Sequence, residues 1–390
     1  MFFVFRGTPK AMSAKILPEI FIKIVRNPRR RKESVRMCTM KRQTACNFGL
    51  CVLHRQFLSF LIISMAALGV FVTELTAQTV PAGCSGEEIQ RALDRLPAGG
   101  EVVLAPGTYI VRQPIVLQRD HQTLRGSGSS TVLFLADNAN CPVVILGAPG
   151  DAPERSISHL RLADLLIDGN RQHQQTETWQ AAGGGPKIIF NNGVSVWNVI
   201  DTVIERVVCC RCRSGGLVSA GGTRRLTVRD FTAFDNQFDG LACYRTEDSI
   251  FTGLQLHDNL AAGISLDLSF DHNLISEALL AGNTLGLFMR DSRDNLFQGL
   301  IIRRSRNDGV FMAQADIQTR DGWQLSPNTE CTGNSFVGLA ISGCGGKPFL
   351  VNDAACTNNV VYGAQFQDND KGGSALASAK PAPARNLLGQ

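Results

Sequence analysis

Between residues 193 and 313, short runs of alternating apolar and polar residues recur, and each run begins one residue after a glycine. These glycines are spaced 23 or 24 residues apart: Gly193, Gly216, Gly240, Gly263, Gly286 and Gly309. A second alternating run follows roughly ten residues later in most units, and an asparagine usually closes the unit. Alternation with a period of two predicts β-strands, because successive side chains of a strand point to opposite faces.

This repeat predicts an all-β fold, a single-stranded parallel β-helix built from coils of about 23 residues. A helix pair with its turns needs a longer repeat, and the spaced leucines of a leucine-rich repeat are missing. We expect the repeat glycines to adopt the left-handed backbone conformation at one corner. We expect Asn236, Asn259, Asn283 and Asn307 to occupy another left-handed corner and to hydrogen-bond along the solenoid axis.

A short amphipathic helix is predicted before the first coil. Ser85 and Glu88 form a capping-box pattern, and Pro97 ends the segment. Four apolar residues fall on one helical face: Ile89, Ala92, Leu93 and Leu96. We expect this helix to cover the first coil, whose strand edges are otherwise open.

The N-terminal region has the features of an export signal. Residues 58–72 are apolar or small, basic residues precede them, and Ala77/Gln78 is a plausible cleavage point. A retained membrane anchor is the alternative, and it is the only membrane contact that we expect. We therefore predict a leader at 1–77, a β-helix domain at 78–370 and a disordered tail at 371–390. The domain would be extracellular, periplasmic or on the cell surface.

The overall net charge of +5 belongs to the leader. Residues 1–77 hold 13 basic and three acidic residues, whereas the remaining 26 basic and 31 acidic residues give a net charge of −5. Nucleic acid is therefore not an expected partner. Nine cysteines lie beyond the leader, and none has a histidine at zinc-ligand spacing. We expect buried thiols, with a single disulfide among Cys331, Cys344 and Cys356.

Three segments resemble the pectate lyase-like superfamily of right-handed parallel β-helix proteins. They are the capping helix, the GGEVVLAPGTY stretch at 99–109 and the LLIDGNR stretch at 165–171. Among these proteins the chain is most similar to mannuronan C5-epimerase modules, which share Asp-Gly corners like Asp239-Gly240 and Asp308-Gly309. It lacks their Asp-Pro-His-Glu motif, because residues 218–222 read VSAGG, and it has Ala262 where they use a histidine. The resemblance implies action on an acidic, uronate-containing polysaccharide by β-elimination, epimerisation or hydrolysis.

Period-two alternation places one set of side chains on the outer face of the solenoid. That set includes two aromatic rings, an acid and a cation on successive coils, an arrangement that suits an extended sugar chain. Asp267 and Arg290 are open to three interpretations: an exposed ion pair, a substrate-binding pair, or a catalytic pair. The predicted catalytic residues are Asp267, Arg290 and Lys187, with Tyr244 and His272 as other candidate bases. The predicted substrate-binding residues are Trp197, Tyr244, Phe288, Phe311 and Trp323, the last in an insertion that we expect to cover the two phenylalanines.

Two clusters of polar residues have alternative interpretations. Asp248, Asp271 and Asp294, with His272 and Asn295, fall in one turn of successive coils, where they could bind Ca²⁺ or bond their own backbone. Asp168 and His173, with Asp164 nearby, indicate a turn rather than a catalytic site. No other cofactor is expected. The alternative to an enzyme is a non-catalytic solenoid that binds carbohydrate or mediates adhesion at the cell surface.

Overall fold

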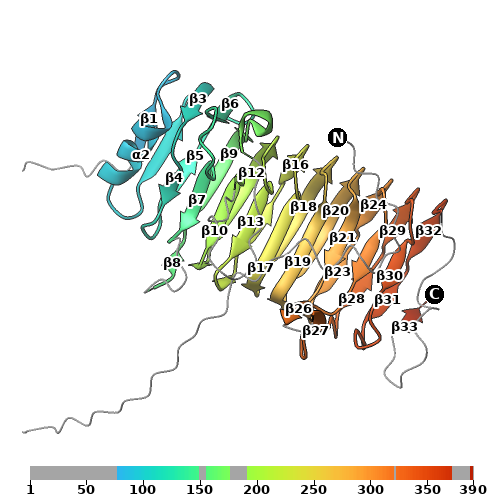
Figure 1. The fold of residues 1–390 in the computed structure, drawn as a ribbon. Coiled ribbons are helices and arrows are strands. Elements are labelled where there is room, and N and C mark those ends of the chain that lie inside the picture. The colour runs from blue at the N-terminus through green and yellow to red at the C-terminus, as the bar shows by residue number, and fades with distance from the viewer. Residues whose placement is uncertain (1–76, 149–154, 176–190, 320–321, 371–386, 390) are drawn as a thin grey trace, which may run out of the picture. The chain divides into compact units, whose positions relative to one another are not determined.

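The chain folds into stacked coils of parallel strands, as the computed structural model shows for residues 77–148, 155–175, 191–319, 322–370 and 387–389 (Figure 1). Sheet A has 18 strands and sheet B has 13, and every pairing within them is parallel. The predicted all-β parallel solenoid is therefore confirmed. In the part of the chain that the structure describes, no helix is long and apolar enough to cross a membrane.

The strands of sheet A supply two limbs of each coil, and their bounds are β1 Ala77–Val80, β2 Glu101–Leu104, β3 Gly107–Val111, β5 Thr123–Arg125, β6 Thr131–Leu135, β9 Arg161–Asp168, β12 Val203–Cys210, β15 Thr227–Arg229, β16 Thr232–Phe234, β18 Ile250–His257, β20 Leu274–Ala281, β23 Leu296–Gln298, β24 Ile301–Arg303, β28 Ser335–Val337, β29 Ala340–Ser342, β31 Val360–Tyr362, β32 Gln365–Gln367 and β33 Leu387–Gly389.

The strands of sheet B supply the third limb, and their bounds are β4 Ile115–Leu117, β7 Val144–Gly147, β8 Ile157–Ser158, β10 Val194–Trp197, β11 Val199–Ile200, β13 Leu217–Ala220, β14 Thr223–Arg224, β17 Leu241–Glu247, β19 Ala262–Asp271, β21 Leu285–Met289, β22 Ser292–Arg293, β25 Val310–Met312 and β30 Phe349–Val351. Three short elements lie outside both sheets: helix α2 Gly86–Arg95, 3₁₀ helix η2 Arg171–His173, and the antiparallel hairpin of β26 Asp316–Thr319 and β27 Gly322–Leu325.

The core runs along the inside of the coils, in the register that the repeat predicts. Leu241 pairs with Ile264, which pairs with Leu287, and Leu287 pairs with Val310. The inward side chains of sheet B are fully buried: Val194, Val196, Leu241, Cys243, Ile264, Leu266, Leu287, Met289, Val310 and Met312. Aromatic residues stack in the same way, with the rings of Phe297 and Phe336 4.6 Å apart. Each coil therefore stabilises mainly its two neighbours.

The repeat glycines are required by close packing between coils, so our expectation of a left-handed backbone at them is wrong. None of the six has a positive φ. A Cβ atom on Gly263 would lie 2.9 Å from the carbonyl oxygen of Gly286, the corresponding glycine of the next coil. The left-handed corners are occupied instead by residues such as Asp201, Arg225 and Asp248.

Replacing Gly263 with alanine is expected to lower the free energy of unfolding by about 1–3 kcal/mol, the usual cost of overpacking. The new methyl group would meet the Asn283 amide nitrogen at 2.8 Å as well as this backbone oxygen, and the oxygen cannot move without displacing the next coil. Urea denaturation of both proteins measures the loss. Gly215→Ala is the comparison, since its nearest neighbour is the Val218 side chain at 2.9 Å, which can rotate. An equal loss in the two variants would contradict this explanation.

Buried asparagines form two ladders that run along the solenoid axis. In the first, the Asn236 amide donates to Asn259 Oδ1 (2.9 Å), and the Asn259 amide donates to Asn283 Oδ1 (3.0 Å). The second ladder joins Asn273, Asn295, Asn334 and Asn359. The predicted bonding along the axis is confirmed for Asn236, Asn259 and Asn283, but none of the four predicted asparagines, Asn307 included, is left-handed. The ladders thus satisfy backbone groups at buried corners.

Helix α2 covers the first coil, as the sequence predicts. Its apolar face is buried, with Ile89, Ala92 and Leu93 at most 1% exposed, and it contacts strands β1 to β4. The Glu88 carboxylate accepts the Ser85 backbone N–H at 2.7 Å, which completes one half of the capping box. The strand edges of the first coil are therefore protected.

The chain ends and the cysteines differ in part from expectation. Most of the predicted leader lies outside the described residues, and Ala77 already belongs to β1. Within the predicted disordered tail, Leu387–Gly389 forms β33 and pairs with β31, whereas 371–386 lie outside the described residues. The nine described cysteines are free thiols. The predicted disulfide is therefore wrong, although the Cys331 N–H donates to Cys356 Sγ at 3.4 Å.

Candidate functional site

The outer face of sheet B carries a buried ion pair between neighbouring coils. Asp267 lies in β19 and Arg290 directly follows β21, and the Arg290 Nε donates to Asp267 Oδ2 at 3.0 Å. The two side chains are only 2% and 5% exposed. The interpretation as an exposed ion pair is therefore wrong. A buried pair is costly to form and very costly to break, so its two charges are firmly held.

Phe288 and Phe311 lie beside this pair and stack on each other. Their ring centroids are 5.6 Å apart and nearly parallel, and the Arg290 guanidinium lies 5.4 Å from the Phe288 centroid. Together with Ala313 and Leu350 they form a small apolar cluster of their own. The insertion, at about residues 314–334, reaches the residue that follows Arg290, because the Thr329 carbonyl accepts the Asp291 N–H at 3.0 Å.

Trp197 and Tyr244 are half-buried on the same face, on earlier coils. Trp197 lies along Gly221, with a ring carbon 3.5 Å from where a Cβ atom on that glycine would be. Tyr244 pairs with Asp267 in the sheet register. Burial, together with the charges of Asp239 and Asp267, raises the pKa of the Tyr244 phenol, although a hydrogen bond with Ser265 opposes the shift.

A second carboxyl, Asp239, belongs to this face and was not among the predicted site residues. It is half-buried at the corner before β17, where its Oδ1 accepts the Ala262 backbone N–H at 2.8 Å. Burial raises the pKa of Asp239 to about 7, despite that hydrogen bond. The signal in the sequence was an acidic residue at an Asp-Gly corner, five residues before an outward tyrosine.

The structure thus brings Tyr244, Asp267, Arg290, Phe288 and Phe311 together on one face. Trp197 lies on the same face beyond Ala220, with which it pairs. Lys187 lies outside the described residues. Trp323 lies in β27 opposite Gln318. The roles of all these residues remain predictions.

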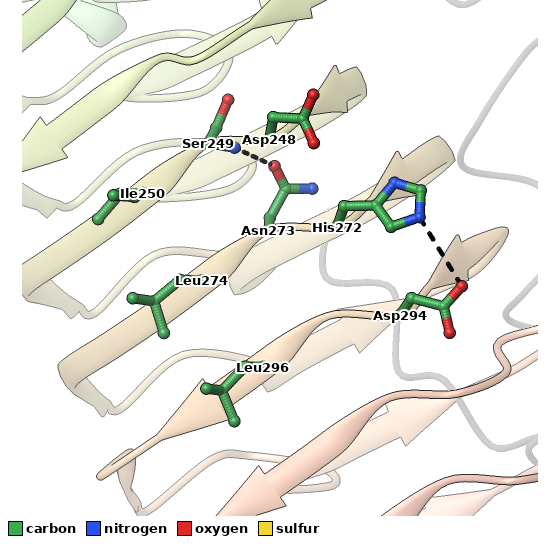
Figure 2. A pocket seen from close by; sticks show the side chains of 8 residues that line it. All are labelled: Asp248, Ser249, Ile250, His272, Asn273, Leu274, Asp294 and Leu296. Carbon is green, nitrogen blue, oxygen red and sulfur yellow. Dashed lines mark hydrogen bonds and ion pairs between the residues drawn. The ribbon is translucent and has the colours of Figure 1, made fainter.

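A shallow groove runs along another edge of the solenoid, where sheet B gives way to sheet A (Figure 2). One side presents Asp248, His272 and Asp294 on successive coils, and the other presents Ile250, Leu274 and Leu296. His272 Nε2 lies 3.9 Å from Asp294 Oδ2. Within the described ranges, no group of three or more His, Cys, Asp or Glu side chains is close enough to hold a metal ion.

The polar side of this groove belongs to a longer column of left-handed corner residues, which we call the corner column. It comprises His121, His159, Asp201, Arg225, Asp248, His272 and Asp294, with φ between 48° and 65°. Charges of opposite sign pair along it, since Arg225 donates to both carboxylate oxygens of Asp201 (2.6 and 2.8 Å) and lowers its pKa. These contacts give Asp201 a structural role, and Asp271 has another, since its Oδ1 accepts the Arg293 N–H at 2.9 Å.

Asp168 and its neighbours likewise form a turn. The buried Asp168 accepts the Asn170 N–H at 3.0 Å and pairs with Arg211. His173 Nδ1 lies 2.7 Å from Asn170 Oδ1. Asp164 is bound by Arg206 at 2.6 Å. Each carboxylate is used within the fold, which agrees with the interpretation as a turn.

Comparison with known proteins gives one family and several relatives. The family described as "right handed beta helix region" matches residues 188–386. The chain is 26% identical to mannuronan C5-epimerase AlgE3 of Azotobacter vinelandii over 224 residues, and 30% identical to AlgE4 of the same organism over 176 residues. These matches cover 54% and 42% of this chain, but only 12% and 30% of the two epimerases.

Solved structures share the fold at lower sequence identity. Pectate lyase Pel9A superposes with a TM-score of 0.50 at 11% identity, covering 80% of this chain and 82% of the lyase. The N-terminal fragment of bacteriophage Phi29 gene product 12 gives a TM-score of 0.51 at 12% identity, covering 80% and 60% respectively. At such identities the similarity concerns the fold alone.

Proposed function

Because the chain belongs to the right-handed β-helix family, we propose that it is an exported protein that acts on an acidic polysaccharide along the outer face of sheet B. The observation that carries this proposal is the buried Asp267–Arg290 pair, flanked by Tyr244 and by the Phe288–Phe311 stack. The partial similarity to proteins named mannuronan C5-epimerases supports a uronate-containing chain as the first substrate to test.

The position of the ion pair favours function over stability. The solenoid core is inside the coils, so the fold does not need a buried charge on the outer face. An apolar pair of similar volume is often as stable as a buried ion pair, or more so. Buried charges that the fold does not require are typical of functional sites. Arg290 would bind a uronate carboxylate while it keeps Asp267, since a guanidinium carries five N–H donors and recognises carboxylates through parallel hydrogen bonds.

The chemistry that follows such binding depends on proton transfer. Neutralising a uronate carboxylate makes the adjacent C5 proton easier to remove, which is the step that β-elimination and epimerisation share. Hydrolysis would instead use two carboxyl groups on either side of the glycosidic bond. On this face Asp239, whose pKa burial raises to about 7, could exchange a proton, whereas the raised pKa of Tyr244 keeps its phenol protonated near neutral pH.

A non-catalytic carbohydrate-binding or adhesion solenoid is the second candidate. It is favoured by residues 218–222, which carry no titratable side chain. Ser219 is fully buried there and bonds to the Thr246 hydroxyl at 2.7 Å. This coil contributes packing rather than acid–base chemistry.

Incubating the full chain with polymannuronate, pectate and glycosaminoglycans, with and without Ca²⁺, tests the proposal. Ultraviolet absorbance detects an unsaturated uronate product, proton NMR detects epimerised residues, and reducing-end assays detect hydrolysis. We expect Arg290→Lys to lower the activity by about tenfold or more, because lysine keeps the charge but loses the bidentate geometry. Circular dichroism confirms that the variant is folded.

Three outcomes are distinguishable. Binding without turnover would favour the adhesion solenoid. Turnover that Arg290→Lys leaves unchanged would place the active site elsewhere on the solenoid. If the protein neither binds nor turns over any of these polymers, the proposal is overturned.

A further inference from the structure

The backbone role of Asp239 does not need a negative charge. The same corner of an earlier coil has Asn192, whose Oδ1 accepts the Gly215 N–H at 3.1 Å. Asp239 Oδ1 accepts the Ala262 N–H, which is also 23 residues later, at 2.8 Å. An asparagine and an aspartate thus make the same bond between coils. This bond therefore needs neither the second oxygen of Asp239 nor its charge.

The described residues around Asp239 offer it no counter-ion. Gly215 and Ala262, which occupy the same corner on the neighbouring coils, carry no charge. Among the residues that the structure describes, no arginine or lysine pairs with Asp239. The charged or titratable groups that share its face are Tyr244 of β17, Asp267 of β19 and Arg290, and the last two neutralise each other. The ionised form of Asp239 is therefore uncompensated.

From this geometry we infer that Asp239 controls how the outer face of sheet B binds a polyanion: the site accepts an acidic sugar chain when Asp239 carries its proton and repels it when Asp239 is ionised. This inference rests on the proposed function and adds a regulating residue to the same face. A protonated carboxyl can donate a hydrogen bond to a uronate, whereas two carboxylates at contact distance repel each other. Because burial raises the pKa of Asp239 to about 7, the change falls near neutral pH.

The direct test measures the affinity of the full chain for a polymannuronate oligosaccharide by calorimetry between about pH 5.5 and pH 8.5. The wild-type protein is expected to bind about tenfold more weakly at the upper end, a difference of about 1.4 kcal/mol, because two like charges near a protein surface repel each other. Asp239→Asn is expected to bind equally well throughout, because asparagine keeps the bond to Ala262 and cannot ionise. Asp308→Asn is the matched control: its Oδ1 accepts the Lys347 N–H at 2.6 Å in the equivalent corner, and its affinity should change with pH as in the wild type.

A second measurement does not depend on any ligand. A raised pKa means that the folded state binds a proton more tightly than the unfolded state, so this group's contribution to stability falls as pH rises towards about 7. Asp239→Asn should therefore have a higher Tm than the wild type at about pH 8 and the same or a lower one at about pH 4. This sign separates titration of Asp239 from a general loss of structure.

The outcomes separate the two proposals. If the wild type binds the oligosaccharide and Asp239→Asn shows the same pH dependence, the role of Asp239 is overturned and the proposed function stands. If the Tm difference has the expected sign but no polymer binds at any pH, the proposed function fails and the polyanion role fails with it. If the affinity of Asp239→Asn does not change with pH, while that of Asp308→Asn and the wild type does, both the proposed function and the role of Asp239 are supported.

Discussion

Replacing Arg290 with methionine is expected to lower the free energy of unfolding by about 3–5 kcal/mol, since Asp267 would be left buried and unpaired. Asp267 is 2% exposed and its Oδ2 accepts the Arg290 guanidinium. Its other oxygen keeps only the Leu268 N–H at 2.8 Å. Urea denaturation followed by circular dichroism measures the loss.

The double variant Asp267→Leu, Arg290→Met separates the cost of an orphaned charge from the value of the pair. We expect it to be more stable than the single variant, because neither charge then remains buried. It should also lose polymer binding, which the proposed function assigns to Arg290. A double variant that is less stable than Arg290→Met would contradict the cost assigned to the orphaned charge, and one that is less stable than the wild type would show that the ion pair contributes net stability to the fold.

Replacing Asn259 with alanine is expected to cost about 2–5 kcal/mol, because several buried polar groups lose their partner together. The Asn259 Oδ1 accepts both the Asn236 backbone N–H (3.2 Å) and the Asn236 amide (2.9 Å). Its own amide donates to the Ala233 carbonyl and to Asn283 Oδ1. Equilibrium denaturation by urea compares the variant with the wild type.

Two further variants control for this result. Asn352 is exposed, so Asn352→Ala should change the stability by less than about 0.5 kcal/mol. Asn259→Asp keeps the shape and the acceptor oxygen, but turns the donor that faces Asn283 Oδ1 into a second acceptor. It should therefore be destabilised at neutral pH. Equal stability of Asn259→Ala and Asn352→Ala would contradict a structural role for the ladder.

The architecture could be predicted because the signals that define it are local and repeated. Strand alternation and the capping box can each be recognised in a short stretch of sequence. The 23-residue spacing repeats from coil to coil, so the same evidence recurs several times along the chain. The role of the repeat glycines could not be predicted in this way. A close approach such as that of Gly263 to the Gly286 oxygen depends on the distance between coils, which the sequence does not state, whereas a left-handed corner is the commoner reason for a glycine.

The candidate site was predicted less completely, for a related reason. The pairing of Asp267 with Arg290 follows from the register, and it was expected. Their burial does not follow, because alternation tells on which side of the sheet a side chain lies and not what covers it. Asp239 was overlooked because an aspartate before a glycine usually serves a turn. Only the comparison with Asn192 shows that its backbone role and its charge are separable.

The corner column limits how the solenoid can change length. Solenoids gain and lose whole coils, and most of the core would tolerate the loss of one, since each apolar layer resembles the next. The column does not have that freedom, because Asp201, Arg225 and Asp248 alternate in sign from coil to coil. Deleting residues 202–225 would place Asp201 beside Asp248, a carboxylate of the same charge, instead of Arg225, whereas deleting residues 202–248 would place Asp201 beside His272. The corner column therefore favours the gain or loss of coils in pairs, whereas the apolar core is compatible with any number of coils.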